Sequence, residues 1–487
     1  MPFPAHKTGV VATIGPASES PETLRRMMQA GLGVARLNFS HGDAAYHAGL
    51  IQRIRQAARE TGARVAILGD LPGPKMRIGE LAVEPVELHT DQTVVLTTED
   101  CLGDASRVSV SFSGLPEAVQ PGDALFLNDG YIQLEVCAVD RSEVTCRVHS
   151  GGELRSRKGL NLPGIDLGIR AFTTDDQEWL RFAAAHELDA VSQSFVVDGD
   201  DILAVRKAAE ALEYAPFIIA KIERAAALEQ LDSILESADG IMVARGDLGV
   251  EIPIASIALA QRRITQRANR HNRPVITATQ MLESMVASRR PTRAEATDVA
   301  NAILGGTDCV MLSGESAMGR YPVEAVAMLA AIARSIEPER DRHMMAGSTG
   351  APDDEGRDRA VDLIARSVFH TAQRRLPRVT VVPTVSGATA RRIARLRLPC
   401  WITAFTPNPA AAQGLQFSYG VHPVEVSEDR ADWNDFTRQW LAEHGIDDGM
   451  VLLVQGPSRA HPGGNHRLEL LELDRDARGN AAEPAPP

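Results

Sequence analysis

Two acidic side chains and a lysine stand at the ends of two consecutive apolar runs, where they could bind a metal ion. The run IIAKIE ends with Lys221 and Glu223, which fall on one face of a strand because side chains alternate with period two. The next run, IMVARGD, ends with Asp247. Two carboxylates with open coordination positions suit Mg²⁺ or Mn²⁺ that also binds substrate oxygens. A simpler interpretation is a structural ion pair between Lys221 and Glu223.

Polar residues follow most of the other apolar runs as well. These residues are Arg36, Asn38, Ser40, Asp70, Lys75, Arg77, Ser194 and Thr279. Arg36, Asn38 and Ser40 alternate with apolar residues and so share one face, and arginine can hold a phosphate through two parallel hydrogen bonds. The turn DLPGPKMR is made rigid by its glycine and prolines and brings Lys75 and Arg77 toward the same region.

These residues need a scaffold that gathers strand ends in one place. Eight runs rich in β-branched residues are predicted strands, at 9–14, 33–38, 65–70, 189–195, 217–221, 240–244, 274–278 and 308–312. Helices are predicted between most of them, at 21–30, 45–61, 175–186, 200–212, 228–237, 257–270 and 293–304. Strands alternating with helices imply a parallel sheet, and eight such units predict an α/β fold with a closed (β/α)₈ TIM barrel.

The alternation breaks between the third and fourth strands, and a second alternation follows the eighth. Strand-like runs at 92–97, 108–112, 124–127, 132–136 and 144–149 predict a small inserted β-barrel lid domain. Strands at 379–382, 401–405, 421–426 and 450–454, with helices at 358–375, 388–396 and 409–417, predict an open α/β domain. We assign 1–70 and 169–336 to the TIM barrel, 71–168 to the lid, 354–475 to the C-terminal domain and 476–487 to a disordered tail. Residues 353–359 are a predicted linker.

Composition argues against several other functions. Of the 487 residues, 44% are hydrophobic and 24% are charged, and no apolar run reaches the ~20 residues that span a membrane. The net charge of −13, without a block of basic residues, argues against a nucleic-acid partner. Five cysteines without a C-x-x-C pair argue against a zinc site or a disulfide framework. Because the start of the chain shows no secretory signal, we expect a cytoplasmic protein.

Seven segments resemble those of pyruvate kinases and follow one another in the order expected of that family. They are GVVATIGPAS (9–18), ARLNFSHG (35–42), KGLNLPG (158–164), IIAKIE (218–223), IMVARGDLGVEIP (241–253), VITATQMLESM (275–285) and RPTRAEATDVANAILGGTDCVMLSGES (290–316). The resemblance covers nearly the whole chain. It implies an Mg²⁺- or Mn²⁺-dependent transfer of a phosphoryl group from phosphoenolpyruvate to ADP, giving pyruvate and ATP in glycolysis. It also implies a homotetramer.

The resemblance implies roles for individual barrel residues. The residues matched to substrate binding are Arg36, Gly246, Asp247 and Thr279. Arg36 matches the contact to the substrate phosphate, and Lys221 matches a lysine that stabilises the enolate and the transferring phosphoryl group. Glu223 and Asp247 match the ligands of the divalent metal. Thr279 lies near the face of the enolate that is protonated, so that it or a nearby water would give the proton.

Three further residues match the nucleotide side of the family's active site. Arg77, and Lys158 at the edge of the lid, match contacts to the nucleotide phosphates. Asp129, in the lid segment LNDG, matches a residue near the nucleotide. Closure of the lid would exclude water and so limit hydrolysis of phosphoenolpyruvate.

The segment VVPTVSGATA in the C-terminal domain resembles the family's effector loop. A strand end, a turn with hydroxyls and glycine, and a helix start favour a bound phosphate. The implied effector residues are Thr384, Ser386, Gly387 and Thr389. The turn holds no arginine or lysine, so Arg391 or Arg392 would have to supply charge to a phosphorylated sugar or nucleotide. The simpler interpretation is an ordinary helix with Ser386 as its N-cap.

The resemblance departs from the common animal form at the monovalent-cation site and is closer to the potassium-independent group. Asn38, Ser40 and Asp70 match this site, but Leu71 stands where a threonine often helps to bind K⁺. Lys75 stands where a glutamate often occurs, and its ammonium could replace the cation. We therefore expect that K⁺ is not required.

Two other functions compete with this interpretation. A metal-dependent lyase of the aldolase type also holds Mg²⁺ on a Glu–Asp pair in a barrel, but it lacks a lid after the third strand. A degenerate relative could instead serve as a sugar-phosphate sensor, although the intact set of barrel residues argues against this. Assaying pyruvate release for dependence on ADP and metal separates all three.

Overall fold

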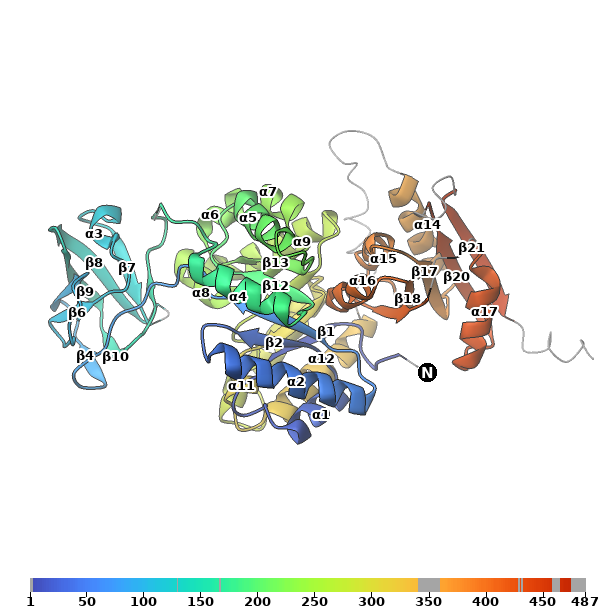
Figure 1. The fold of residues 1–487 in the computed structure, drawn as a ribbon, viewed down its shortest axis with the longest axis horizontal. Helices are drawn as coiled ribbons and strands as arrows, with labels where there is room; N and C mark the ends of the chain where they lie inside the picture. Colours follow the sequence, from blue (N-terminus) through green and yellow to red (C-terminus); the bar gives the residue numbers. More distant parts are fainter. Residues whose placement is uncertain are drawn as a thin grey trace, which may run out of the picture.

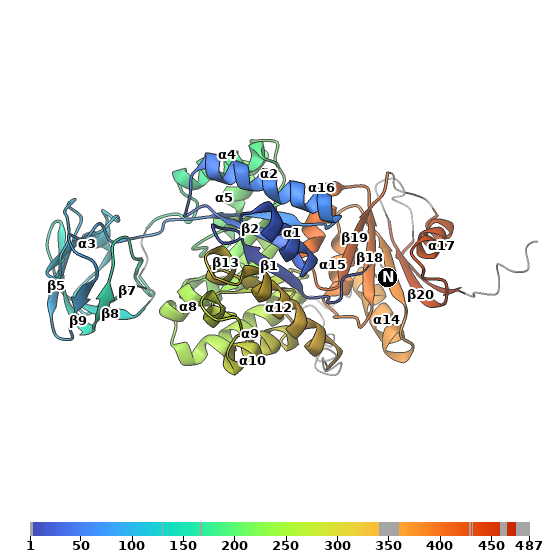
Figure 2. The same cartoon turned by 90° about the horizontal axis from the view of Figure 1, so that it is seen from below.

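The computed structural model describes residues 3–128, 130–165, 168–339, 360–427, 430, 432–457 and 465–473. Asp129, the predicted linker at 353–359 and the predicted tail at 476–487 lie outside these residues. A barrel lies between a small β-rich part and a C-terminal α/β part (Figure 1). The same order is seen after a 90° turn (Figure 2).

A closed barrel of eight parallel strands forms the central part. In pairing order the strands are β1 (Gly9–Thr13), β16 (Cys309–Leu312), β15 (Val275–Ala278), β14 (Gly240–Ala244), β13 (Phe217–Ile222), β12 (Ala190–Gln193), β3 (Ala66–Leu71) and β2 (Leu32–Asn38). Every neighbouring pair is parallel. The predicted TIM barrel is confirmed, and all eight predicted strands are present.

Both faces of the barrel strands are buried, which explains their almost continuous apolar sequence. One set of side chains, including Val11, Leu68 and Met242, forms a cluster within the strand ring. The other set, including Val10, Ile67 and Ile241, belongs to the larger core that includes the surrounding helices. Because apolar side chains fill both faces along the strands, most of the polar site residues lie at the strand ends.

Helices surround the barrel and make the crossovers. They are α1 (Pro21–Gln29), α2 (Ala44–Thr61), α4 (Thr174–Ala185), α5 (Gly199–Glu210), α6 (Ala225–Glu229), α7 (Leu231–Ser237), α8 (Arg245–Glu251), α9 (Ile257–Arg270), α10 (Arg293–Leu304), α11 (Gly314–Ala317) and α12 (Pro322–Ile336). The helix predicted at 228–237 is two helices, because Gln230 has a non-helical φ of −99° and ψ of 18°. We predicted no helix for α12, which buries Ala325, Val326 and Leu329.

The inserted part contains two sheets around one apolar core. The larger sheet has the order β11 (Leu160–Asn161), β7 (Ala124–Leu127), β8 (Ile132–Val139), β9 (Glu143–Ser150), β5 (Thr93–Thr97), β6 (Arg107–Ser109). The smaller sheet pairs β4 (Val86–Leu88) with β10 (Gly152–Leu154), and α3 (Leu115–Ala118) is a single short helix. Five strands lie where runs were predicted, and the two sheets stand where we expected a small β-barrel. The strands that we missed, β4, β10 and β11, have only two or three residues.

The C-terminal part is an open five-stranded sheet with helices. Its order is β19 (Val421–Glu425), β18 (Trp401–Thr406), β17 (Val379–Pro383), β20 (Gly449–Gln455), β21 (Arg467–Leu473). The helices are α14 (Ala360–Arg374), α15 (Ala388–Ala394), α16 (Pro409–Gly414) and α17 (Asn434–Glu443). The open α/β prediction is confirmed for this part. Two elements were not predicted, α17 and the antiparallel edge strand β21.

A buried ion pair joins the C-terminal part to the barrel. The Arg397 side chain is fully buried, and its Nη1 donates to Oδ1 of Asp308 at 2.5 Å. Asp308 directly precedes β16, so the contact lies at the amino ends of the barrel strands. The carboxyl ends of the strands thus remain available for a site on the other side. Within the described part of the chain, no helix is both long and apolar enough to cross a membrane.

Candidate active site

A cavity lies at the carboxyl ends of the barrel strands. The predicted site residues that line it are Arg36, Asn38, Ser40, Asp70, Lys75, Lys221, Glu223, Asp247 and Thr279. Other lining residues include Ser194, Phe195, Met242, Met311 and Ser313. The barrel therefore brings together residues that are separated by more than 200 positions in the sequence.

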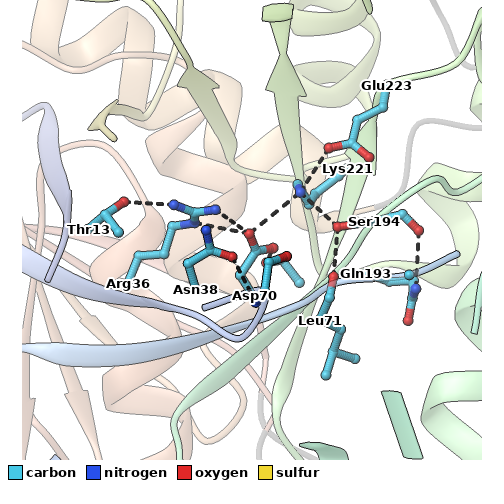
Figure 3. A network of polar contacts seen from close by, with 12 residues as sticks. Thr13, Arg36, Asn38, Asp70, Leu71, Gln193, Ser194, Lys221 and Glu223 are labelled. Carbon is cyan, nitrogen blue, oxygen red and sulfur yellow. Dashed lines mark hydrogen bonds and ion pairs between the residues drawn. The ribbon is translucent and has the colours of Figure 1, made fainter. Parts of the chain in front are cut away.

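Arg36 is fixed by the residues around it (Figure 3). Its Nη1 donates to Thr13 Oγ1 at 2.7 Å, and its Nε and Nη2 both donate to Asp70 Oδ2. Asp70 also accepts from Ser192 Oγ at 2.5 Å. Burial alone would raise the pKa of Asp70, but Arg36 and Lys221 hold it at about 2. Asp70 is therefore ionised at neutral pH and keeps the guanidinium in place.

Lys221 lies between two carboxylates (Figure 3). Its Nζ is 2.8 Å from Glu223 Oε1 and 3.5 Å from Asp70 Oδ2, and it donates to Ser194 Oγ at 2.7 Å. Ser194 Oγ in turn donates to the Leu71 carbonyl at 2.7 Å. Burial lowers the pKa of Lys221, but Asp70 and Glu223 more than offset this and raise it. The side chain is a fixed cation at the floor of the cavity.

The two predicted metal ligands influence each other. Burial raises the pKa of Glu223, and the nearby charge of Asp247 raises it further, although Lys221 acts in the opposite direction. Glu223 Oε2 accepts the N–H of Phe195 at 2.8 Å, and Phe195 has the unusual φ of 58°. Asp247 lies in the first turn of α8, not at a strand end as we expected, because the helix begins at Arg245. The predicted proximity of the two carboxylates is nevertheless present.

Within the described part of the chain, no larger cluster of metal-binding side chains accompanies this pair. Among the residues that the structure describes, no group of three or more His, Cys, Asp or Glu side chains could hold a metal ion. A cation bound by Glu223 and Asp247 would therefore need further oxygens from a substrate or from water. This is the arrangement expected of Mg²⁺, which keeps several non-protein ligands.

Thr279 is held against the start of α8. Its Oγ1 accepts the N–H of Gly246 at 2.8 Å and donates to the Ala278 carbonyl at 2.7 Å. Gly246 is thus beside Thr279, as expected for two substrate contacts. The φ of Thr279 is 65°, in the left-handed region that residues other than glycine seldom adopt.

The residues predicted to contact the nucleotide lie where the chain crosses into the lid. Arg77 Nη1 donates to the Arg157 carbonyl at 2.9 Å, and the N–H of Ile78 donates to the Lys158 carbonyl at 2.9 Å. Burial lowers the pKa of His41, and the charges of Arg77, Lys75 and Arg36 lower it further. These cations are therefore near one another at the mouth of the barrel. Neither Arg77 nor Lys158 lines the cavity itself.

Comparison with known proteins identifies this arrangement. Residues 5–326 match the family described as "Pyruvate kinase, barrel domain" and residues 362–466 match "Pyruvate kinase, alpha/beta domain". The chain belongs to the pyruvate kinase family. It is 43% identical to the pyruvate kinase of Thermococcus litoralis, with 97% of this chain and 100% of that one covered. It is also 43% identical to the Geobacillus stearothermophilus pyruvate kinase, with 86% and 72% covered.

A solved structure agrees with the family assignment. The crystal structure of a pyruvate kinase from Cryptosporidium parvum superposes with a TM-score of 0.88 at 34% identity and covers 96% of this chain and 97% of that chain. The chain is thus a phosphotransferase of the pyruvate kinase type. The resemblance inferred from the seven sequence segments is confirmed.

The predicted effector turn at 384–389 lies in the C-terminal part and contributes no residue to the cavity lining. Thr384 Oγ1 accepts the N–H of Gly387 at 3.0 Å. Gly387, with a φ of 77°, is the N-cap of α15, so the simpler interpretation with Ser386 as N-cap is wrong. Arg391 donates to the Ser386 carbonyl at 2.9 Å, and the side chain of Arg392 lies 3.5 Å from Asp362. Both candidate cations thus already have partners, and the role of Thr389 stays a prediction.

Several residues of the site were missed in the sequence. Thr13 and Ser192 each contact the Arg36–Asp70 pair, and Arg245 contacts the backbone of Thr279. The only signal for Ser192 was its spacing of two from Ser194, the residue after β12, because this spacing puts both hydroxyls on one face of an extended chain. Leu71 is fully buried and does not line the cavity, so only its carbonyl contributes to the network.

Proposed function

We propose that this chain transfers the phosphoryl group of phosphoenolpyruvate to ADP through the residues of the barrel cavity. The observation that carries the proposal is the buried ion network, in which Lys221 lies between Asp70 and Glu223 and Arg36 is bound to Asp70. Phosphoryl transfer depends on positioning and on neutralising crowded anionic oxygens more than on covalent chemistry. Two fixed cations at the floor of one cavity suit that requirement.

Glu223 and Asp247 would hold Mg²⁺ or Mn²⁺. The site fits such an ion, because both ligands are hard oxygens and the raised pKa of Glu223 reflects buried negative charge that a cation offsets. When bound, the metal neutralises and orients substrate oxygens. Arg36 contacts the substrate phosphate, and Lys221 stabilises the negative charge of the enolate and of the phosphoryl group in transfer.

Protonation of the enolate completes the reaction. Thr279 Oγ1 accepts from the Gly246 N–H and donates its proton to the Ala278 carbonyl, so proton transfer requires the hydroxyl to turn from that carbonyl toward the enolate. In our proposal, the O–H bond of Thr279 or of a nearby water breaks as the C–H bond of pyruvate forms, and solvent returns the proton to the donor oxygen. Gly246 keeps the hydroxyl in place through the step.

The nucleotide would bind between the barrel and the lid. Arg77 and Lys158 contact the phosphates of ADP, and the lid excludes water from the cavity. The lid already approaches the barrel beside Asp247, because Gly130 lies next to Val250 of α8, so closely that a side chain at position 130 would touch it.

We propose further that this enzyme does not need K⁺. Lys75 lines the same cavity as Asn38, Ser40 and Asp70. Two like charges about 4 Å apart repel by about 4 kcal/mol at an effective dielectric of about 20, so an ammonium there would exclude a second cation. The position of Lys75 therefore supports replacement of the monovalent ion.

The remaining expectations are proposals that rest on family membership. They are a glycolytic role, a cytoplasmic location, a homotetramer and regulation by a phosphorylated sugar or nucleotide at the 384–389 turn.

The experiment that tests the proposed function is a coupled assay of pyruvate release by the purified chain. Release should require phosphoenolpyruvate, ADP and a divalent metal together, and Glu223→Gln should abolish it. Release without ADP would point to another reaction and would refute the proposal.

A further inference from the structure

Thr279 has an unfavourable backbone conformation at the point where the proposed chemistry needs it. Its φ is 65°, and that of Gln280 is 52°. Both values lie in the left-handed region, which a β-branched residue such as threonine rarely adopts. The two residues directly follow β15, and Thr279 lines the cavity. Such a conformation persists only when surrounding contacts hold it.

The guanidinium of Arg245 supplies these contacts. Its Nε donates to the Ala278 carbonyl at 3.2 Å and its Nη2 to the Thr279 carbonyl at 2.7 Å, so it binds the backbone on both sides of the Thr279 Cα. Asp298 on α10 fixes the guanidinium by accepting from Nη1 at 2.6 Å. The Arg245 side chain is only 10% exposed, so these bonds are shielded from water.

The same contacts determine where the Thr279 hydroxyl lies. Oγ1 donates to the Ala278 carbonyl, the oxygen that Arg245 also binds. A carbonyl oxygen has two lone pairs and can accept from both. Gly246, the residue next to Arg245, donates to Oγ1 from the other side. A shift of the Arg245 guanidinium would therefore move the Thr279 hydroxyl together with the Ala278 carbonyl and the Gly246 N–H that bind it.

We infer that Arg245, fixed by Asp298, is a positioning residue for proton transfer by Thr279. The inference rests on the proposed function and deepens it. Arg245 should affect the proton-transfer step more than the binding of phosphoenolpyruvate, because in the proposed function Arg36, from a different strand, holds the substrate phosphate. A role only in folding would instead change stability and leave the rate of proton transfer in the folded enzyme unaltered.

The test compares Arg245→Lys with the matched control Arg206→Lys. The Nη2 of Arg206 also donates to a backbone carbonyl, that of Ser237 at 2.9 Å, and to a carboxylate, that of Asp239 at 3.0 Å. Asp239 precedes β14, so this contact lies at the opposite end of the barrel. Two reactions are measured on the full chain with Mg²⁺. One is pyruvate release, and the other is exchange of pyruvate methyl protons with solvent deuterium by NMR, which needs proton transfer without phosphoryl transfer.

Arg245→Lys should lower kcat and methyl exchange by about 10- to 100-fold, with a KM for phosphoenolpyruvate within about threefold of the unmodified enzyme. Arg206→Lys should change neither rate. Asp298→Ala, which keeps the guanidinium but removes the carboxylate that fixes it, should lower exchange by a smaller factor and serves if Arg245→Lys does not fold. Unmodified exchange in folded Arg245→Lys, or in Asp298→Ala, would overturn the inference. An unmodified chain that released no pyruvate would instead overturn the proposed function.

Discussion

Replacing Lys221 by methionine removes the buried cation but keeps a side chain of similar length. The ammonium lies 2.8 Å from Glu223 Oε1 and 3.5 Å from Asp70 Oδ2, so it is held in one position before substrate binds. An ammonium about 4 Å from a negative charge on the reacting substrate would stabilise that charge by about 4 kcal/mol at an effective dielectric near 20. If that interaction forms mainly in the transition state, its loss lowers kcat by about 10³-fold. The KM for phosphoenolpyruvate should change little, because Arg36 remains.

The assay is steady-state pyruvate release at saturating ADP and Mg²⁺, with phosphoenolpyruvate varied. Lys207→Met is the control, because Lys207 is an exposed lysine on α5. Its kcat and KM should equal those of the unmodified enzyme. A Lys221→Met enzyme that kept kcat within tenfold, or that was impaired only in KM, would refute the assigned role of the lysine.

Three further predictions concern cations and the effector turn. Burial and the charge of Asp247 raise the pKa of Glu223, so its ionised form costs stability that is fully present above the folded pKa and is lost as the pH falls through it. A cation bound by Glu223 and Asp247 should offset this cost, so Mg²⁺ should raise Tm in calorimetry, and equal increases in Glu223→Gln would contradict this. The activity of the unmodified enzyme should be similar in potassium, sodium and tetramethylammonium buffers of equal ionic strength. Lys75→Glu should lower the activity and make part of it K⁺-dependent. Strong K⁺ stimulation of the unmodified enzyme would show that Lys75 does not replace the ion. A phosphorylated sugar or nucleotide should raise the rate of pyruvate release at sub-saturating phosphoenolpyruvate. If the rate does not change as candidate effectors are added, and Ser386→Asp also leaves it unchanged, the proposed effector turn is ruled out.

The parts of the site that could be predicted are those that depend on local pattern. Period two along β13 correctly placed Lys221 and Glu223 on one face, and the alternating Arg36 and Asn38 of β2 line the same cavity. These predictions succeeded because strand ends of a closed parallel barrel converge, whatever the details of packing. Residues assigned by local pattern were therefore brought together by topology alone.

Contacts that depend on pairing between distant segments could not be predicted. That Ser192 meets Asp70 follows from the register of β12 against β3, in which these two residues are partners. The positive φ of Phe195, which aims its N–H at Glu223, has no sequence signal because phenylalanine seldom adopts it. By contrast, α17 could have been found, since its buried Trp440 and Leu441 follow Thr437 at helical spacing.

The most direct test of the central claim follows phosphorus by ³¹P NMR after phosphoenolpyruvate, ADP and Mg²⁺ are mixed with the purified chain. The structure predicts that the phosphoenolpyruvate signal decreases as the γ-phosphate signal of ATP grows in equal amount, and that Lys221→Met slows both together. Appearance of inorganic phosphate in place of ATP, or equal rates with and without ADP, would contradict phosphoryl transfer at this cavity.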